Sequence, residues 1–363
     1  MNGTQITNAL VWLGPRQMEW QQVAAAALTP GQVRIEVQAV GICGSELSGY
    51  LGHNSLRVPP LVMGHEFSGV VQEVGAGAEA AAGDVLSVGD RVVVNPLLTC
   101  GECDFCLSGH DNLCEQRALI GAHLPGAFAD SVVVPAAACL PLADSVDFLS
   151  GSLAEPLACA VRAVSLAAGG DALGGSASAS PGGSGRGKSR GSLRVIGAGP
   201  IGLLCALVAK RSGFDEVSIY DPNEVRMALA ARWGIAGSSQ DASPANAAID
   251  AVGLEATRKS AIAAVRRGGT AVFIGLHSPQ AVFDGNDLAR DEKVVRGCFA
   301  YTKSNFASAV ALLEEELVPA VDEWVVVRDL SAGRASFEEL TGPDPASVKI
   351  VLRPDGADWR LDA

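Results

Sequence analysis

A glycine-rich turn at residues 197–202 constrains the fold of this chain more than any other feature of its sequence. An apolar strand is predicted over residues 193–196 and an apolar helix over residues 201–210, and the turn reads Gly197-Ala198-Gly199-Pro200-Ile201-Gly202. The first glycine permits a tight turn, the second lets a pyrophosphate approach the backbone, and the third lets the helix pack against the strand. A bare G-x-G-x-x-G is common by chance, but the flanking strand and helix predict a dinucleotide-binding turn.

The alternation of strand and helix continues beyond this turn and predicts a doubly wound parallel sheet of the Rossmann kind. Further strands are expected at residues 217–220, 248–252, 270–274 and 293–298. Asp221 follows the second strand, nineteen residues after Gly202. A carboxylate at this position bonds both ribose hydroxyls and repels a 2′-phosphate, so we expect NAD rather than NADP.

Residues 1 to about 140 follow a different pattern. Short alternating runs at residues 33–37, 69–74 and 90–94 are separated by Gly, Pro and Asp, which predicts a β-rich domain. The tail returns to β character at residues 325–327 and 348–352 and is expected to rejoin this first domain. A chain of 363 residues suits this division into two domains.

The composition excludes several classes of partner. A formal net charge of -13, with no local run of Lys or Arg, disfavours nucleic acids and anionic membrane surfaces. The first fifteen residues lack the features of a secretory signal, and no apolar run reaches the ~20 residues that cross a bilayer. We therefore expect a cytoplasmic protein, with neither nucleic acid nor a membrane as partner.

Four cysteines follow the pattern Cys100-x2-Cys103-x2-Cys106-x7-Cys114. In a chain without export signals, such a cluster indicates metal ligands before disulfides. Four thiolates close a tetrahedral zinc site with no open position, which is typical of a structural zinc. The alternatives are an iron-sulfur cluster, which also uses four Cys, and four free thiols, which would be prone to oxidation.

A second set of zinc-type ligands is dispersed along the chain: Cys43 in GICGS, His65 and Glu66 in GHE, and Glu155 in AEP. Each motif alone is weak, because a lone Cys or His is more often a core residue and an acid before Pro156 often only begins a helix. Together, upstream of a dinucleotide turn, they predict a catalytic metal site assembled by the fold.

Residues 169–191 are mostly Gly and Ser and cannot repay the entropy of ordering. We interpret them as a flexible surface insertion at the amino end of the first parallel strand. The alternative is a partner or modification site, suggested by Arg186, Lys188 and Arg190.

These segments together resemble the zinc-containing medium-chain alcohol dehydrogenases. GICGSE, GHEFSGVV, VGDRVVV, CGECDFC, AEPL and VIGAGPIG occur in the family's order along nearly the whole chain. The resemblance implies an α/β protein with a GroES-like β domain over residues 1–160, completed by residues 299–363 and carrying two zinc ions. It also implies a Rossmann domain over residues 161–298 and an active cleft between the two domains. A glutamate at the position of Glu155 resembles the sorbitol, threonine and butanediol dehydrogenase branch of the family, whereas ethanol-type enzymes have Cys at this position.

The resemblance also implies a reaction. The catalytic zinc would be held by Cys43, His65 and Glu66, with Glu155 either a near neighbour or an exchanging ligand. It would lower the pKa of a secondary alcohol, polyol or hydroxy-amino acid, whose alkoxide transfers hydride to NAD. Ser45 accepts the hydroxyl proton in the family; alternatively it is only a turn hydroxyl.

The family further implies cofactor contacts and an assembly. Val252, Gly253, Ile274 and Gly275 would line the nicotinamide, and Arg226 either packs on the adenine or is a solvated helix charge. The family also suggests a homodimer or homotetramer that pairs Rossmann sheets edge to edge.

Three departures from the family pattern bear on function. The relay His expected five residues after Cys43 is Ser48, so protons would leave through water or His53. Ala300 replaces an Arg of sorbitol dehydrogenases, which argues against sorbitol itself. Only about fourteen residues separate Trp233 from the strand at residue 248, where the family usually fits a strand and a helix. We expect this truncation at one sheet edge to weaken the adenine pocket more than the hydride-transfer centre.

Two alternatives to a zinc dehydrogenase differ in their ligands. A zinc-free quinone or enoyl reductase of the same superfamily would lack Cys43, His65 and the four-cysteine lobe, all of which are present. A non-catalytic or regulatory NAD-binding homologue is kept open by Ser48, Ala300 and the edge truncation.

Overall fold

The structure, a computed structural model, describes residues 6–81, 83, 85–170, 190–239, 242–319, 321–343 and 345–354. It divides into two compact units. Unit 1 comprises Met1–Glu155, Ala309–Glu316 and Ala320–Ala363, and unit 2 comprises Pro156–Ser308 and Leu317–Pro319. The predicted insertion at residues 169–191 lies, except for its ends, outside the described residues. None of the described helices has the length and apolar character that crossing a membrane requires.

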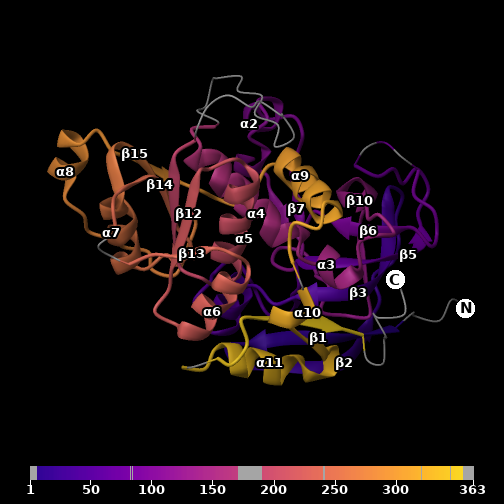
Figure 1. Cartoon of the computed structure of the whole chain (residues 1–363). Coiled ribbons are helices and arrows are strands. Elements are labelled where there is room, and N and C mark those ends of the chain that lie inside the picture. The colour runs from indigo at the N-terminus through magenta and orange to yellow at the C-terminus, as the bar shows by residue number, and fades with distance from the viewer. Residues whose placement is uncertain are drawn as a thin grey trace, which may run out of the picture. The chain divides into compact units, whose positions relative to one another are not determined.

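Unit 1 is built mainly from β-strands (Figure 1). Its strands are β1 (Ile6–Gly14), β2 (Gln17–Ala24), β3 (Gln32–Gly41), β4 (Leu61–Val62), β5 (Glu66–Val74), β6 (Arg91–Val94), β7 (Leu97–Leu98), β8 (Ala118–Leu119), β9 (Ser131–Pro135), β10 (Cys139–Pro141), β17 (Val325–Asp329) and β18 (Lys349–Arg353). Its helices are α1 (Gly44–Tyr50), α2 (Asp104–Leu107), α3 (Phe148–Gly151), α10 (Val321–Trp324) and α11 (Gly333–Leu340), with 3₁₀ turns at Asp111–Leu113, Ala136–Ala138 and Leu330–Ala332.

The largest sheet of unit 1 joins both ends of the chain. Its strands run in the order β10-β6-β5-β3-β18-β17, and β9 also pairs with β3. The three predicted N-terminal strands are confirmed as β3, β5 and β6, and the predicted tail strands as β17 and β18. Alternate side chains of β3, including Val33, Ile35 and Val37, are buried in one apolar core with Ile350 and Leu352 of β18. The C-terminal strand is therefore part of this core rather than an appendage.

Unit 2 contains a six-stranded parallel sheet in the order β13-β12-β11-β14-β15-β16, as expected for a Rossmann fold. The strands are β11 (Ser192–Ile196), β12 (Glu216–Tyr220), β13 (Ala236–Gly237), β14 (Ala245–Asp250), β15 (Val265–Phe273) and β16 (Val294–Gly297). The helices are α5 (Pro200–Arg211), α6 (Glu224–Arg232), α7 (Glu255–Ala264) and α8 (Gly285–Arg290). Two further helices, α4 (Ala154–Ala167) and α9 (Lys303–Glu314), each contribute residues to both units.

Helices cover both faces of this sheet. Successive side chains of a strand point to opposite faces. Val195 faces α5, because its Cγ1 is the side-chain atom nearest to where a Cβ on Gly202 would lie. The next residue, Ile196, packs instead with Ala261 and Ile262 of α7. Figure 1 shows α5 beside β12 and α7 beside β14 and β15.

The connection from β13 to β14 lacks its crossover helix. Residues 238–244, of which 240 and 241 lie outside the described part, show no helix, although the edge strand β13 is kept as two residues. The prediction of a missing strand is therefore wrong and that of a missing helix is confirmed for the residues described. A strand survives because Ser218 and Ile219 of β12 still pair with Ala236 and Gly237.

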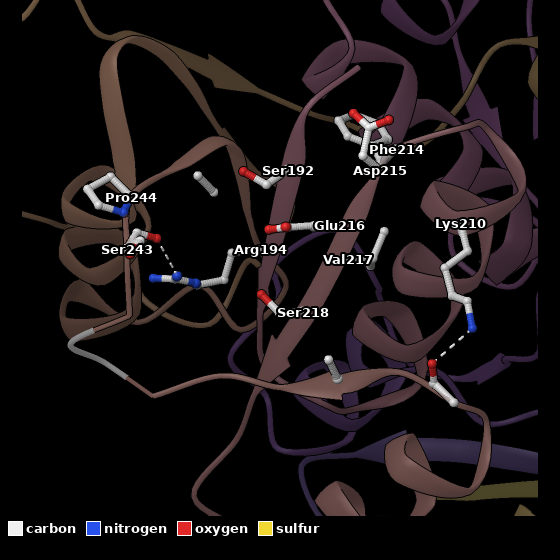
Figure 2. A pocket seen from close by; sticks show the side chains of 13 residues that line it. Ser192, Arg194, Lys210, Phe214, Asp215, Glu216, Val217, Ser218, Ser243 and Pro244 are labelled. Carbon is white, nitrogen blue, oxygen red and sulfur yellow. Dashed lines mark hydrogen bonds between the residues drawn. The ribbon is translucent and has the colours of Figure 1, made fainter. Parts of the chain in front are cut away.

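The sheet face that this helix would cover is polar instead. Ser192, Arg194 and Ser218 point to one side of β11 and β12, and Val217 points to the other (Figure 2). Arg194 donates to the carbonyl oxygen of Ser243 at 2.8 Å and so fastens the short connection. A pocket of about 520 Å³ lies here, at the amino ends of β11 and β12. This is the edge opposite the glycine turn, so the pocket is not the predicted cofactor site.

Candidate functional site

The four predicted lobe cysteines lie together in unit 1. Cys103 is the N-cap of α2 and Cys106 lies within this helix. All four sulfur atoms lie within 4.8 Å of one another. The Sγ atom of Cys100 is 3.8 Å from that of Cys106 and 3.5 Å from that of Cys114. Tetrahedral zinc with Zn–S bonds of about 2.3 Å requires sulfurs about 3.8 Å apart. The donor set of the lobe therefore fits a four-thiolate zinc ion.

The thiols of this lobe differ in their acidity. The backbone N–H of Glu102 and that of Cys103 lower the pKa of Cys100 to about 6. Burial raises the pKa of Cys106 to about 12. Backbone N–H donation is the usual way a metal-binding loop stabilises thiolate charge, and here it favours Cys100 as the first thiolate of the lobe.

The second predicted ligand set is brought together by one strand pair. Antiparallel pairing of β3 with β5 sets Gly41 opposite Glu66, so Cys43, two residues past Gly41, lies beside His65 and Glu66. Ligand atoms of these three side chains lie within 4.8 Å of one another. A sulfur, an imidazole nitrogen and a carboxylate oxygen form a zinc-type donor set with three protein ligands, which leaves the fourth position for a substrate. The donor set fits a catalytic zinc.

Glu46 orients His65 within this set. The Glu46 side chain is fully buried, and its Oε1 lies 2.8 Å from His65 Nδ1 and accepts from the backbone N–H of Gly64 at 2.8 Å. Its Oε2 accepts from the N–H of Cys43 at 3.0 Å. A carboxylate on Nδ1 directs Nε2 of His65 toward a metal. Glu46 was not among the predicted site residues, although its position three residues after Cys43, the N-cap of α1, is that of a capping box.

Burial and charge oppose each other at this pair. Burial raises the pKa of Glu46, but the charges of His65 and Arg57 and the hydrogen bonds from His65 and the backbone of Cys43 together outweigh burial, and the pKa is lowered. Burial lowers the pKa of His65, but the charges of Glu46 and Cys43 and the hydrogen bonds to both side chains together outweigh burial, and the pKa is raised well above its usual value. Glu46 is therefore a carboxylate under ordinary conditions and can hold His65 in place.

Lys349 of β18 is the second residue that the sequence analysis missed. Its Nζ forms an ion pair with Oε2 of Glu66 and donates to the carbonyl oxygen of Ile42 at 3.0 Å. Burial lowers its pKa, but the charges of Glu66, Cys43 and Glu46 and the hydrogen bond to Glu66 together outweigh burial. The pKa is raised, so Lys349 is an ammonium. In the sequence, Lys349 could have been recognised as unusual because it interrupts the otherwise apolar run of residues 348–352.

Ser45 is held by the buried Arg57. The guanidinium donates to the carbonyl oxygen of Ser45 at 3.1 Å and to its Oγ at 3.4 Å, and Ser45 Oγ lies 3.5 Å from Cys43 Sγ. Gly49 makes room, because a Cβ there would be 2.8 Å from Cδ of Arg57. The Ser45 hydroxyl is thus fixed beside the predicted metal ligand Cys43, and Arg57 is a third residue that the sequence did not reveal.

Glu155 lies at the amino end of α4 and is buried. Among the described residues, the cluster of ligand atoms around Cys43 does not include it. Its role as a near neighbour or an exchanging ligand stays a prediction, as does proton release past Ser48 through water or the exposed His53.

The predicted nucleotide turn has the required backbone. Gly197 has φ +99°, Gly199 is the N-cap of α5 and Pro200 occupies its first turn, followed by Ile201. A Cβ on Gly202 would overlap the carbonyl oxygen of Gly197, so the helix approaches the strand closely only because this residue is glycine.

Asp221 is the acid at the end of the next strand. Its Oδ2 accepts from the N–H of Ala198 and its Oδ1 from the N–H of Asn223, both at 2.8 Å. Nη1 of Arg226 lies 3.6 Å from Oδ2. The structure therefore ties Asp221 to the glycine turn and puts Arg226 beside it. Packing of Arg226 on the adenine stays a prediction.

The four residues predicted to line a nicotinamide follow β14 and β15. A Cβ on Gly253 would overlap the backbone of Gly275, and one on Gly275 would overlap that of Gly253 and Val252. The fully buried Asp250 accepts from the N–H groups of Val252 and Gly253, both at 3.0 Å. Two glycines in direct backbone contact thus shape this end of the sheet, and Ile274 lies between β15 and Gly275.

Comparison with known proteins agrees with this arrangement. Residues 29–144 match the family model for the alcohol dehydrogenase GroES-like domain, and residues 200–315 match that for a zinc-binding dehydrogenase. The chain is 30% identical to L-galactonate-5-dehydrogenase of Escherichia coli K12, over 86% of this chain and 89% of that protein. It is also 30% identical to a probable D-xylulose reductase A of Aspergillus fumigatus, over 86% of this chain and 87% of that protein.

A solved structure extends the likeness to three dimensions. The crystal structure of 2R,3R-butanediol dehydrogenase from Bacillus subtilis superposes with a TM-score of 0.81 at 27% identity, covering 96% of this chain and 100% of that one. The chain therefore belongs to the zinc-binding, medium-chain alcohol dehydrogenase family and is an oxidoreductase of the GroES-like plus Rossmann architecture.

Proposed function

We propose that this protein oxidises a secondary alcohol of a polyol or sugar acid, with NAD as hydride acceptor and one catalytic and one structural zinc ion per chain. The observation that carries the proposal is the cluster of Cys43, His65 and Glu66, whose ligand atoms lie within 4.8 Å of one another. The names of its relatives, a galactonate dehydrogenase, a xylulose reductase and a butanediol dehydrogenase, support the substrate class.

The chain's own residues divide the work of the reaction. Cys43, His65 and Glu66 would hold a zinc ion, which supplies Lewis-acid polarisation of a bound hydroxyl. Glu46 keeps the imidazole of His65 turned toward that ion through its 2.8 Å contact with Nδ1. Ser45, fixed by Arg57, accepts the proton of the substrate hydroxyl and passes it on.

The cofactor site is assigned to the glycine turn and its neighbours in unit 2. The turn at residues 197–202 receives the pyrophosphate, and residues 252–253 and 274–275 receive the nicotinamide. Asp221 favours NAD through its charge, while Arg226 beside it would attract a 2′-phosphate. We assign the preference to Asp221 because its carboxylate is fixed by two backbone N–H groups.

The same proposal includes a homodimer or homotetramer. β16 is the edge strand of the parallel sheet, pairing only with β15 among the described strands. Val294 on this strand is an exposed large apolar side chain, and Leu276 and Val282, between β15 and α8, are exposed as well. An open strand edge with apolar neighbours is typical of a surface that pairs with a second copy.

The function is tested by metal analysis and one pair of variants. The wild type should contain two zinc ions per chain and reduce NAD with a sugar acid, pentitol or diol. Cys43→Ala should lose one zinc ion and more than about 100-fold in turnover, with unchanged circular dichroism. Cys139→Ala, a buried thiol on β10 of the same unit, is the matched control and should keep both. Unchanged turnover in Cys43→Ala would remove the metal site from the mechanism.

A further inference from the structure

Glu66 has a second partner besides the predicted metal. A carboxylate has two oxygens, and Oε2 of Glu66 is engaged by the ammonium of Lys349. Both side chains are almost completely buried, with 3% of Lys349 and 2% of Glu66 exposed. If Glu66 binds a metal ion, it does so through a carboxylate whose Oε2 already forms an ion pair with Lys349.

Several elements of unit 1 are shaped around this ion pair. The pairing of β18 with β3 sets Val351 opposite Gly41 and so brings Lys349 to the end of β3. A Cβ on Gly41 would overlap Oε2 of Glu66 and would lie 3.1 Å from Nζ of Lys349. The carbonyl oxygen of Ile42 accepts a second hydrogen bond from the ammonium. Because a buried ammonium is strongly unfavourable without such partners, this is a built arrangement rather than a surface contact.

The number of donors decides what a zinc site can do. Cys43 and His65 each offer one donor, so a carboxylate that bound through both oxygens would complete a closed set of four. A closed set is typical of a structural zinc, whereas a catalytic zinc needs an open position for substrate. A carboxylate with one oxygen engaged by an ammonium supplies only one donor.

We propose that Lys349 is a positioning residue that restricts Glu66 to a single donor oxygen and thereby keeps one coordination position open for the substrate hydroxyl. This inference rests on the proposed function. It assigns to the C-terminal strand a part in the metal site that the motifs around Cys43 and His65 do not reveal. The ammonium also offsets the charge of Glu66, which leaves more of the metal's charge to act on a bound hydroxyl.

Cobalt(II) in place of zinc, with imidazole as an added ligand, tests the open position directly. Visible absorption of the cobalt protein reports each imidazole that binds the metal. The wild type should bind imidazole with a clear spectral change. Lys349→Met should retain the cobalt but bind imidazole more weakly by on the order of 10-fold or more. Lys349→Arg, which keeps a cationic donor, should restore the response.

Lys293→Met is the matched control, because Lys293 is also a largely buried lysine bonded to a carbonyl oxygen and a carboxylate, but in unit 2. It should bind imidazole as the wild type does. Equal imidazole affinity in Lys349→Met and the wild type would overturn the Lys349 inference alone. A wild-type cobalt spectrum that does not respond to imidazole would instead overturn the proposed catalytic site.

A measurement on the wild type covers the case in which Lys349→Met does not fold, since breaking a buried pair is strongly destabilising. Infrared difference spectra between metal-loaded and metal-free protein distinguish a one-oxygen from a two-oxygen carboxylate ligand, and Glu66→Gln identifies the band of Glu66. The inference expects the one-oxygen pattern. A two-oxygen pattern for Glu66 in the wild type would overturn it.

Discussion

Replacing Asp221 by Asn should shift cofactor preference from NAD toward NADP. The Asp221 side chain is 6% exposed, and its two oxygens accept from Ala198 and Asn223, both at 2.8 Å. Its charge is therefore fixed at the end of β12, where the adenosine ribose of a dinucleotide lies in this fold. Asn removes the charge and keeps the shape, and it leaves Arg226 without its carboxylate partner.

The magnitude follows from two terms. Two unit charges about 5 Å apart repel by about 3 kcal/mol at an effective dielectric constant of about 20, so NADP gains about this much. NAD loses about 1 kcal/mol, because hydrogen bonds to a charged acceptor are worth about 1.5–3 kcal/mol and those to a neutral one about 0.5–1.5 kcal/mol. The sum of about 4 kcal/mol corresponds to roughly a thousandfold change in the NAD to NADP preference.

Calorimetric titration with NADH and NADPH measures this ratio without knowledge of the substrate. Asn has one acceptor oxygen, so the variant loses one backbone hydrogen bond and about 1–3 kcal/mol of stability. That loss affects both cofactors equally and cancels in the ratio of dissociation constants. Asp215→Asn, at the opposite end of β12 and bonded to the N–H of Gly191, is the control. A ratio that changes less than about tenfold in Asp221→Asn would refute the electrostatic reasoning.

Two further predictions concern the four-cysteine lobe of unit 1 and the edge strand β16 of unit 2. After zinc is removed with a chelator, iodoacetamide should label Cys100 first. The labelling rate should rise as pH increases through about 6, because the thiolate fraction of Cys100 grows there, whereas Cys106, with a pKa of about 12, stays protonated. Peptide mass spectrometry that finds Cys106 labelled as fast at neutral pH would contradict this. Val294→Lys, on the exposed edge strand β16, should weaken assembly at least tenfold in sedimentation equilibrium because a charge opposes edge pairing, and unchanged assembly would exclude this edge as the interface.

The Rossmann part of the fold was predictable because its signals are local. The strand, the three glycines and the helix lie within about twenty consecutive residues. The structure confirms the strand that ends at Ile196 and the helix that follows, which begins at Pro200, one residue before the predicted start. The exception was the edge beyond β12. There, a strand of only Ala236 and Gly237 survives, which is too short for any periodic pattern to reveal.

The metal ligands were recognisable as types, but their supporting residues were not. Glu46 was close enough in sequence to Cys43 to be found by its capping-box spacing. Arg57 and Lys349 act through contacts across 12 and 283 residues of chain, and no single-sequence pattern encodes such distances. The pairing of β3 with β5 and β18 brings Lys349 to Glu66, and Arg57 reaches Ser45 from the segment between α1 and β4.

The position of Lys349 late in the chain has a consequence for how the protein is made. The first 155 residues contain every other member of the metal cluster, yet β18 reaches the sheet only after 194 more residues have been synthesised, since 349 minus 155 is 194. At about 5–20 residues per second, that is a delay of roughly 10–40 s during translation. Throughout this interval Glu66 lacks Lys349 as its ammonium partner, and the central sheet lacks β18 and, until residue 329, β17 as well. The nascent chain thus cannot complete the proposed metal site before the intervening Rossmann unit has been produced.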